Sequence, residues 1–278
     1  MDIITCHYNP CGYENMRRNY RTFREKLGRP LITVELSYTG KFEIPDAIHI
    51  HGTEKNMMWQ KERMLNIAIE QSKADVVAWV DADLIWQNDR WYEDTLRLLE
   101  TKTWVQLFEG VQYLDAKGRN DKYMEGFANF LENNTRHRQP GGAWACRREC
   151  LAGHGLYDAN IIGGADQVMA YCVNGQWDGF MWTRMNNFQV KHALKWASNV
   201  YDNFDRKIGY VPGAVKHLYH GTRKNRNYVN RWKKLTDHDF DPATDIRIGD
   251  NGLYEWCTEK PIMHKRVRNY FLERKEDE

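Results

Sequence analysis

The chain has 278 residues, a formal net charge of +2 and a hydrophobic fraction of 42%. This length and hydrophobic content allow one large folded domain, or one domain with an appendage, and the small net charge excludes a molecule that attracts nucleic acid through its overall charge. No apolar run reaches the roughly 18 residues of a membrane span, and the first residues lack the basic-then-apolar order of a signal peptide. We therefore expect a cytoplasmic protein with reduced cysteines.

Strand and helix patterns alternate over the first hundred residues. Short apolar runs at 2–6, 31–38, 47–51 and 75–80 predict strands, and residues 13–27 and 56–72 predict helices. The run at 75–80 is almost continuously apolar, as in a strand that is buried on both faces of a parallel sheet. This order predicts an α/β fold with a mostly parallel sheet flanked by helices, whose ligand lies beyond the carboxyl ends of the strands.

The second half of the chain has weaker patterns. Residues 104–114 predict one strand, residues 117–140 a polar loop, residues 161–173 a turn followed by a helix, and residues 265–278 a charged helix or tail. We predict one catalytic domain over residues 1–222, with a nucleotide-binding half (1–100) and an acceptor half (101–222). Residues 223–278 form a basic C-terminal extension in this interpretation.

Two acids follow the buried strand directly. Asp81 and Asp83 are one residue apart and are flanked by apolar residues on both sides. Carboxylates in such surroundings are costly unless a cation pairs with them, and hard ions such as Mg²⁺ or Mn²⁺ prefer oxygen ligands and bridge diphosphate oxygens. A solvated strand end is the alternative interpretation.

Four segments resemble a known family when they are taken in order. They are the helix residues 61–66 before the Asp-x-Asp strand, the Gly-Gly segment 141–149, the segment 155–158, and Gly-Gly-Ala-Asp at 163–166. The chain resembles the GT-A glycosyltransferases over residues 1–222, and the order is similar to that of the β-1,4-galactosyltransferase and polypeptide GalNAc-transferase catalytic domains. In the galactosyltransferases a Glu-Asp pair follows the glycines, whereas this chain has Ala165 and Asp166 there.

The resemblance implies a metal site and a nucleotide site. A late histidine completes the metal site of the family, so the implied ligands of Mn²⁺ (or Mg²⁺) are Asp81, Asp83 and His220, with His217 as the rival histidine. Asp81 is placed on the metal or on the ribose. The implied nucleotide-binding residues are His7, Asn9, Lys61, Arg63 and Asp81.

Asp166 is the candidate catalytic base. A carboxylate within hydrogen-bond reach of an acceptor hydroxyl can take its proton, although Asp is also a favoured helix cap. The candidate sugar- and acceptor-binding residues are Gly142, Trp144, Gly163 and Gly164. Glycines allow the backbone to approach a sugar closely, and Trp144 either stacks on a sugar face or belongs to the core.

The stretch 222–234 is basic and contains aromatic residues. Arg223 and Lys224 are candidates for binding the diphosphate of the donor. The same stretch also fits a nucleic-acid patch or a solvated helix face.

The sequence thus predicts a metal-dependent glycosyltransferase that moves a sugar from a nucleotide donor, with UDP-sugar favoured, to an acceptor hydroxyl. The Asp166 match favours inversion at the anomeric carbon. The leading acceptor is a bacterial or phage glycan. The alternatives are a phage-type enzyme that glycosylates DNA bases, an inactive sugar- or nucleotide-binding module, and a nucleotidyltransferase, which shares the paired acids.

Overall fold

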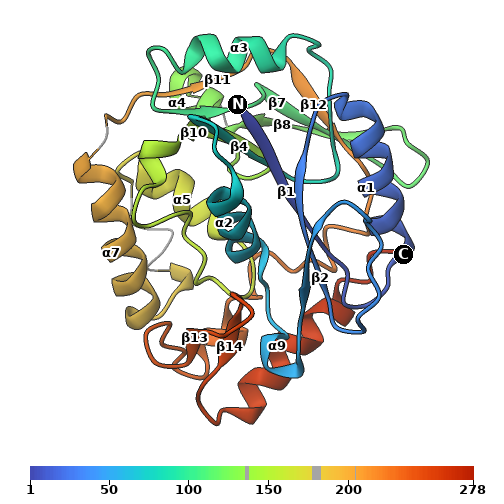
Figure 1. Ribbon diagram of the computed structural model, residues 1–278, viewed down its shortest axis with the longest axis vertical. Coiled ribbons are helices and arrows are strands. Elements are labelled where there is room, and N and C mark those ends of the chain that lie inside the picture. The colour runs from blue at the N-terminus through green and yellow to red at the C-terminus, as the bar shows by residue number, and fades with distance from the viewer. Residues whose placement is uncertain (135–137, 177–182, 204) are drawn as a thin grey trace.

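A seven-stranded sheet runs through the middle of the molecule (Figure 1). The computed structural model describes residues 1–134, 138–176, 183–203 and 205–278. In spatial order the strands are β11 (Ile208–Tyr210), β6 (Trp104–Gln106), β10 (Ala143–Arg147), β4 (Val76–Val80), β1 (Asp2–Tyr8), β2 (Ile32–Ser37) and β3 (Ile48–His51). Neighbours are parallel except at β10, which is antiparallel to β4 and β6. The predicted α/β class with a mostly parallel sheet is confirmed.

Side chains alternate across this sheet and build one apolar layer on each face. Along β4, Val77 and Trp79 belong to one buried cluster, whereas Ala78 and Val80 belong to the other, as the two-residue period of a strand requires. Helices α2 (Lys61–Gln71), α5 (Ala165–Val173) and α7 (Asn187–Asn203) contribute to the first cluster. Helices α1 (Glu14–Leu27) and α3 (Trp91–Leu98) contribute to the second.

A second, five-stranded sheet lies beside the first. In spatial order it contains β5 (Leu84–Trp86), β12 (Ala214–His217), β7 (Gly110–Leu114), β8 (Asn120–Gly126) and β9 (Arg138–Gln139). The prediction of one strand over 104–114 is wrong, because β6 and β7 belong to different sheets. The loop prediction for 117–140 is also wrong in part, since β8 and α4 (Phe127–Asn133) lie there. β8 is mostly polar and exposed, so its pairing with β7 gives no apolar pattern.

The C-terminal segment returns to the N-terminal half of the chain. After the short helix α8 (Lys233–Thr236) and the hairpin of β13 (Ile246–Ile248) and β14 (Tyr254–Trp256), helix α9 (Pro261–Glu273) leads to the last residues. The Asp277 carboxylate accepts hydrogen bonds from the backbone N–H groups of Glu14 (3.0 Å) and Asn15 (2.8 Å) at the start of α1, and Figure 1 shows the C-terminus beside this helix. Residues 223–278 therefore pack against the domain that we predicted for 1–222, and the boundary itself stays a prediction.

Two short 3-10 helices, Glu54–Asn56 and Arg148–Leu151, complete the elements of the described residues. None of the described helices has the length and apolar character that crossing a membrane requires.

Candidate functional site

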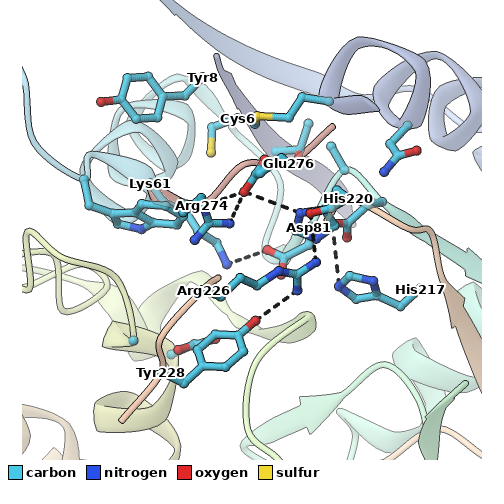
Figure 2. A pocket seen from close by; sticks show the side chains of 18 of the residues that line it. Cys6, Tyr8, Lys61, Asp81, His217, His220, Arg226, Tyr228, Arg274 and Glu276 are labelled. Atoms are coloured by element: carbon cyan, nitrogen blue, oxygen red, sulfur yellow. Dashed lines mark hydrogen bonds and ion pairs between the residues drawn. The ribbon is translucent and has the colours of Figure 1, made fainter. Parts of the chain in front are cut away.

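A cavity of about 370 Å³ opens at the carboxyl ends of β1 and β4, where ligands bind in open α/β sheets. Figure 2 shows side chains from both halves of the chain and from the C-terminal segment around it. The ionisable residues that line it include Lys61, Glu62, Asp81, Asp83, Asp166, His217, His220, Arg223, Arg226, Arg231, Arg274 and Glu276.

Asp83, His217 and His220 form a cluster with the donor atoms of a metal site. Their candidate ligand atoms all lie within 4.8 Å of one another. The Asp83 Oδ2 atom is 3.0 Å from His220 Nε2 and 3.7 Å from His217 Nε2. The pairing of β5 with β12 brings them together, because it sets His217 opposite Leu84, the residue after Asp83. His217 and His220, which the sequence offered as alternative ligands, thus lie at the same site.

The electrostatics of this cluster fit a divalent cation. His217 Nδ1 donates to the Leu218 carbonyl (2.9 Å), so the lone pair of Nε2 faces the Asp83 carboxylate. Burial lowers the pKa of His217 to about 4, which keeps the imidazole neutral at neutral pH. Burial alone would raise the pKa of Asp83, but His217, His220 and Arg226 outweigh it and hold this pKa below its usual value.

Asp83 also has a buried oxygen, Oδ1, with no hydrogen-bond partner in the described part of the chain. A buried polar atom of this kind normally has a partner. A carboxylate and two imidazoles are a donor set that suits Mn²⁺ better than Mg²⁺. These residues therefore fit the predicted metal.

Glu276 stands behind His220 and is the main residue of the metal site that the sequence did not reveal. Its Oε1 atom lies 3.5 Å from His220 Nδ1, and Arg274 pairs with the same carboxylate (Figure 2). Burial opposes ionisation of Glu276, but Arg274 and His220 prevail and lower its pKa to about 2. Histidine ligands of metals usually have such a carboxylate or carbonyl partner on the other ring nitrogen, which orients the ring.

Asp81 is not part of this cluster. The Lys61 ammonium lies 2.5 Å from Asp81 Oδ1, and the Asp81 backbone N–H donates to the Gly142 carbonyl (2.7 Å). Burial raises the pKa of Asp81 to about 6 against the opposing effect of Lys61. The predicted role of Asp81 on the metal or the ribose stays a prediction, and Lys61 contacts its carboxylate directly.

Asp166 reaches the cavity from the first turn of α5. The N-cap of this helix is Gly164, with a φ of 91°, so Asp166 is not the cap, although its Oδ1 accepts from the Gln167 N–H (2.8 Å). Its other oxygen lies against Gly141, where an added Cβ would be 1.8 Å away. Burial, reinforced by Asp166, raises the pKa of nearby Glu62 to about 8.

The predicted nucleotide-binding residues are only partly brought together. His7 lines the cavity. The Asn9 side chain instead exchanges hydrogen bonds with the backbone of Tyr13 at 2.8 and 2.9 Å. Arg63 pairs with Asp158 at 3.3 Å. Neither Asn9 nor Arg63 is among the residues that line the cavity.

The predicted acceptor residues also divide into two groups. Trp144 is 5% exposed and packs in the apolar layer under α2 and α5, so the structure favours its core interpretation. Gly142 packs against the side chains of the core. Gly163 and Gly164 have φ values of 78° and 91° and lie against the Arg231 guanidinium, but of these glycines Gly164 alone lines the cavity.

The basic stretch 222–234 turns partly inward. Arg223 lines the cavity, whereas Lys224 does not. Arg226 and Arg231 are only 4% and 6% exposed and also line it. The DNA alternative depended on an exposed basic patch, so the structure does not support it.

No protein-family model matches the chain, and no curated protein matches its sequence. Among solved structures, glucosyl-3-phosphoglycerate synthase from Mycobacterium tuberculosis, in complex with Mn²⁺, UDP and glucosyl-3-phosphoglycerate, is similar with a TM-score of 0.44 and 13% identity. The match covers 84% of this chain and 76% of that chain. S. aureus TarS, in complex with UDP-GlcNAc, has a TM-score of 0.46 and 9% identity, over 80% of this chain and 60% of that chain.

Similarity at this level says nothing about the reaction of this chain. The narrower resemblance to the β-1,4-galactosyltransferase and GalNAc-transferase domains stays a prediction, because the similar structures described above belong to other proteins. Any functional conclusion has to rest on the residues of the cavity.

Proposed function

We propose that the protein is a metal-dependent glycosyltransferase of the GT-A type, which transfers a sugar from a nucleoside diphosphate to an acceptor hydroxyl. The observation that supports this most strongly is the cluster of Asp83, His217 and His220 at the carboxyl end of the sheet, inside a cavity that also contains a separate carboxylate, Asp166. The predicted Asp-x-Asp motif and its late histidine lie in one cavity in this structure.

The metal end of the cavity would hold the diphosphate of the donor. Asp83, His217 and His220 would hold a divalent ion, which would supply positive charge next to the departing diphosphate. Arg226 donates to the His220 carbonyl (3.3 Å), so its guanidinium lies beside the cluster, and Arg223 lines the same cavity. Guanidinium groups bind phosphate oxygens with two parallel hydrogen bonds, which orients the leaving group as well as stabilising its charge.

The α5 end of the cavity would hold the acceptor. Asp166 takes the proton from the acceptor hydroxyl, while the oxygen of that hydroxyl attacks the anomeric carbon and the bond to the diphosphate oxygen breaks. Attack from the face opposite the diphosphate inverts the configuration at this carbon. The left-handed conformation at Gly164 lets the backbone come close to the sugar without a side chain in the way.

Lys61 and Glu62 lie at the start of α2, between these two ends. Lys61 neutralises Asp81, and the raised pKa of Glu62 keeps its carboxyl protonated over much of the neutral range. Protonated Glu62 therefore adds little repulsion to an anionic donor, and it leaves Asp166 as the base. We favour a UDP-sugar as donor, Mn²⁺ as metal and a glycan hydroxyl as acceptor.

A ligand screen tests the donor and the metal together. Melting temperatures are measured with UDP, CDP, GDP and several UDP-sugars, with and without Mn²⁺, because a ligand that binds only the folded state raises the melting temperature. We expect a rise with at least one nucleotide in the presence of Mn²⁺ and a smaller rise without it. No shift with any nucleotide would reject the proposal.

The reaction type is tested with the donor that the screen identifies. Slow hydrolysis of the nucleotide-sugar, with water as acceptor, should release the nucleoside diphosphate and should stop in Asp83→Ala but not in the surface variant Asp89→Ala. Release of pyrophosphate from a nucleoside triphosphate would indicate the nucleotidyltransferase. Tight nucleotide binding without turnover would indicate the inactive module.

A further inference from the structure

Two buried arginines of the cavity, Arg226 and Arg231, have no carboxylate partner within the ranges that the structure describes. They are 4% and 6% exposed, and the Nε atom of each is buried without a hydrogen-bond partner among the described residues. The neighbouring Arg274 is different, because Glu276 pairs with it. Burying a cation without a counter-charge is costly. Arg226 lies near enough to Asp83 and Glu276 to lower the pKa of both carboxyl groups. Arg231 forms no ion pair in the described part of the chain, so it needs an anion from elsewhere.

The two arginines face different parts of the cavity. Arg226 donates to the His220 carbonyl (3.3 Å) and therefore lies beside the metal cluster. Arg231 lies at the start of α5, since a Cβ added to Gly164 would be 2.6 Å from its Nη2 atom. Tyr228 contacts both arginines: its hydroxyl accepts from Arg226 (3.0 Å), and its ring centroid is 5.1 Å from the Arg231 guanidinium carbon.

The surroundings of Arg231 have an excess of positive charge. Its Nη1 atom donates to the Tyr270 hydroxyl (3.2 Å), and Arg274 donates to the same hydroxyl (3.2 Å). Burial, reinforced by Arg231, lowers the pKa of the nearby Arg184. Two guanidinium groups thus share one phenol hydroxyl, and of the two Arg274 also has a carboxylate partner, Glu276, whereas Arg231 has none among the described residues.

The donor diphosphate does not account for this second region. A divalent ion already matches the charge of a diphosphate diester, and Arg226 donates to the His220 carbonyl at the same end of the cavity. Arg223 lies there too, because its guanidinium carbon is 5.0 Å from the Tyr113 ring, which packs against His217. Arg231 lies instead beside Gly164, two residues before Asp166, where the proposed function places the acceptor. A second anion is therefore expected on the acceptor side.

We infer that the acceptor is itself an anion, a phosphate ester or a carboxylate, and that Arg231 binds its charged group while Asp166 faces one of its hydroxyls. This inference rests on the proposed function and adds the substrate class. The transferred sugar forms a bond to the acceptor oxygen and loses its bond to the diphosphate, whose oxygen keeps the electron pair. The proton goes to Asp166, and the anionic group of the acceptor is unchanged.

The test uses the full chain with Mn²⁺ and saturating UDP, so that the donor end is filled. Three small probes are titrated by calorimetry: glycerol 3-phosphate, glycerate and glycerol. We expect one of the two anions to bind and glycerol not to bind, and the tighter anion indicates whether the acceptor carries a phosphate or a carboxylate. This comparison needs no variant, so it does not depend on how a substitution affects folding.

Two matched variants then separate the arginines. Arg231→Gln should weaken binding of the anion by about 10- to 100-fold, the range for losing charged hydrogen bonds, and should leave Mn²⁺–UDP affinity within about twofold of wild type. Arg226→Gln should instead weaken binding of Mn²⁺–UDP and leave the affinity for the anion close to that of the wild type. Arg231→Lys should restore part of the anion affinity, because it keeps the charge but loses the planar fork.

Three results would overturn the inference while leaving the proposed function intact. The first is that neither anion binds although Mn²⁺–UDP does. The second is that glycerol binds as tightly as the anions. The third is that Arg231→Gln weakens UDP binding as strongly as Arg226→Gln does. In the last case both arginines serve the diphosphate. Failure of UDP itself to bind with Mn²⁺ would instead overturn the proposed function, and this inference with it.

Discussion

Gly141→Ala should displace Asp166 without removing it. A Cβ at position 141 would lie 1.8 Å from Asp166 Oδ2. The carboxylate oxygen must therefore retreat by about 1.2 Å to reach the 3.0 Å below which real Cβ contacts essentially never occur. The backbone of Gly141 is not in the left-handed region that favours glycine, so alanine itself fits the main chain.

The size of the effect follows from this displacement. A misplacement of about 1 Å at a reacting group costs about 100-fold in rate, or about 2.7 kcal/mol of transition-state stabilisation. We expect the turnover of nucleotide-sugar in Gly141→Ala to fall by about this factor. The Mn²⁺–UDP affinity should stay at the wild-type value, because the atoms nearest to the new Cβ all belong to Asp166 and none to the metal cluster.

Steady-state kinetics and calorimetry on the same preparation measure the two quantities. Gly209→Ala is the matched control, since its new Cβ would meet only the flexible stem of Lys102, at 3.0 Å. Asp166→Asn should lower turnover at least as much as Gly141→Ala. Wild-type turnover in Gly141→Ala, with the protein folded, would refute the assignment of Asp166 as the base.

Three further predictions address the metal site, a buried acid and the core. Glu276→Gln should weaken Mn²⁺ binding by about 10- to 100-fold through the loss of the carboxylate behind His220; electron paramagnetic resonance of free Mn²⁺ measures this, and an unchanged affinity would contradict it. The Glu62 pKa of about 8 lies above its unfolded value of 4.5, so the free energy of unfolding should fall as pH rises from 4.5 to 8, by at most about 5 kcal/mol. Urea titrations should show that the free energy of unfolding depends less on pH in Glu62→Gln than in the wild type. The same pH dependence in both proteins would contradict this prediction. Trp144→Ala should cost about 3–5 kcal/mol of stability and leave the affinity of the folded protein for the nucleotide-sugar unchanged. If Trp144 stacked on the sugar, this affinity would fall and stability would change little.

The central strands could be predicted because each is buried on both faces. β4 is apolar at nearly every position, so its pattern survives without knowledge of its partners. β8 is the opposite case: it is exposed and polar over most of its length, and pairing with β7 defines it. Nothing in a local window distinguishes such a strand from a loop.

The presence of a metal site could be predicted from the sequence, but the full set of its ligands could not. Asp83 could be found because it follows a buried strand, and a late histidine was expected from the resemblance. His217 joins His220 because β12 pairs with β5 and sets it next to Asp83. Strands far apart in the sequence make this pairing, so spacing alone left the two histidines as rivals.

The buried charges of the C-terminal segment could not be predicted. The sequence around Arg226 and Arg231 is as polar and charged as that of a solvent-exposed helix face, and Glu276 lies in a run of charged residues. Their burial depends on the return of the chain to α1 and on the contact of its end with the start of that helix. Pairwise packing of this kind leaves no periodic pattern in the sequence.

Anomalous X-ray scattering at the manganese edge, from crystals grown with Mn²⁺ and UDP, tests the central claim most directly. The account predicts one strong peak within coordination distance of the Asp83 carboxylate and of Nε2 of His217 and His220, with UDP phosphate oxygens completing the shell. A peak at Asp81 alone, or UDP bound away from these three residues, would contradict it.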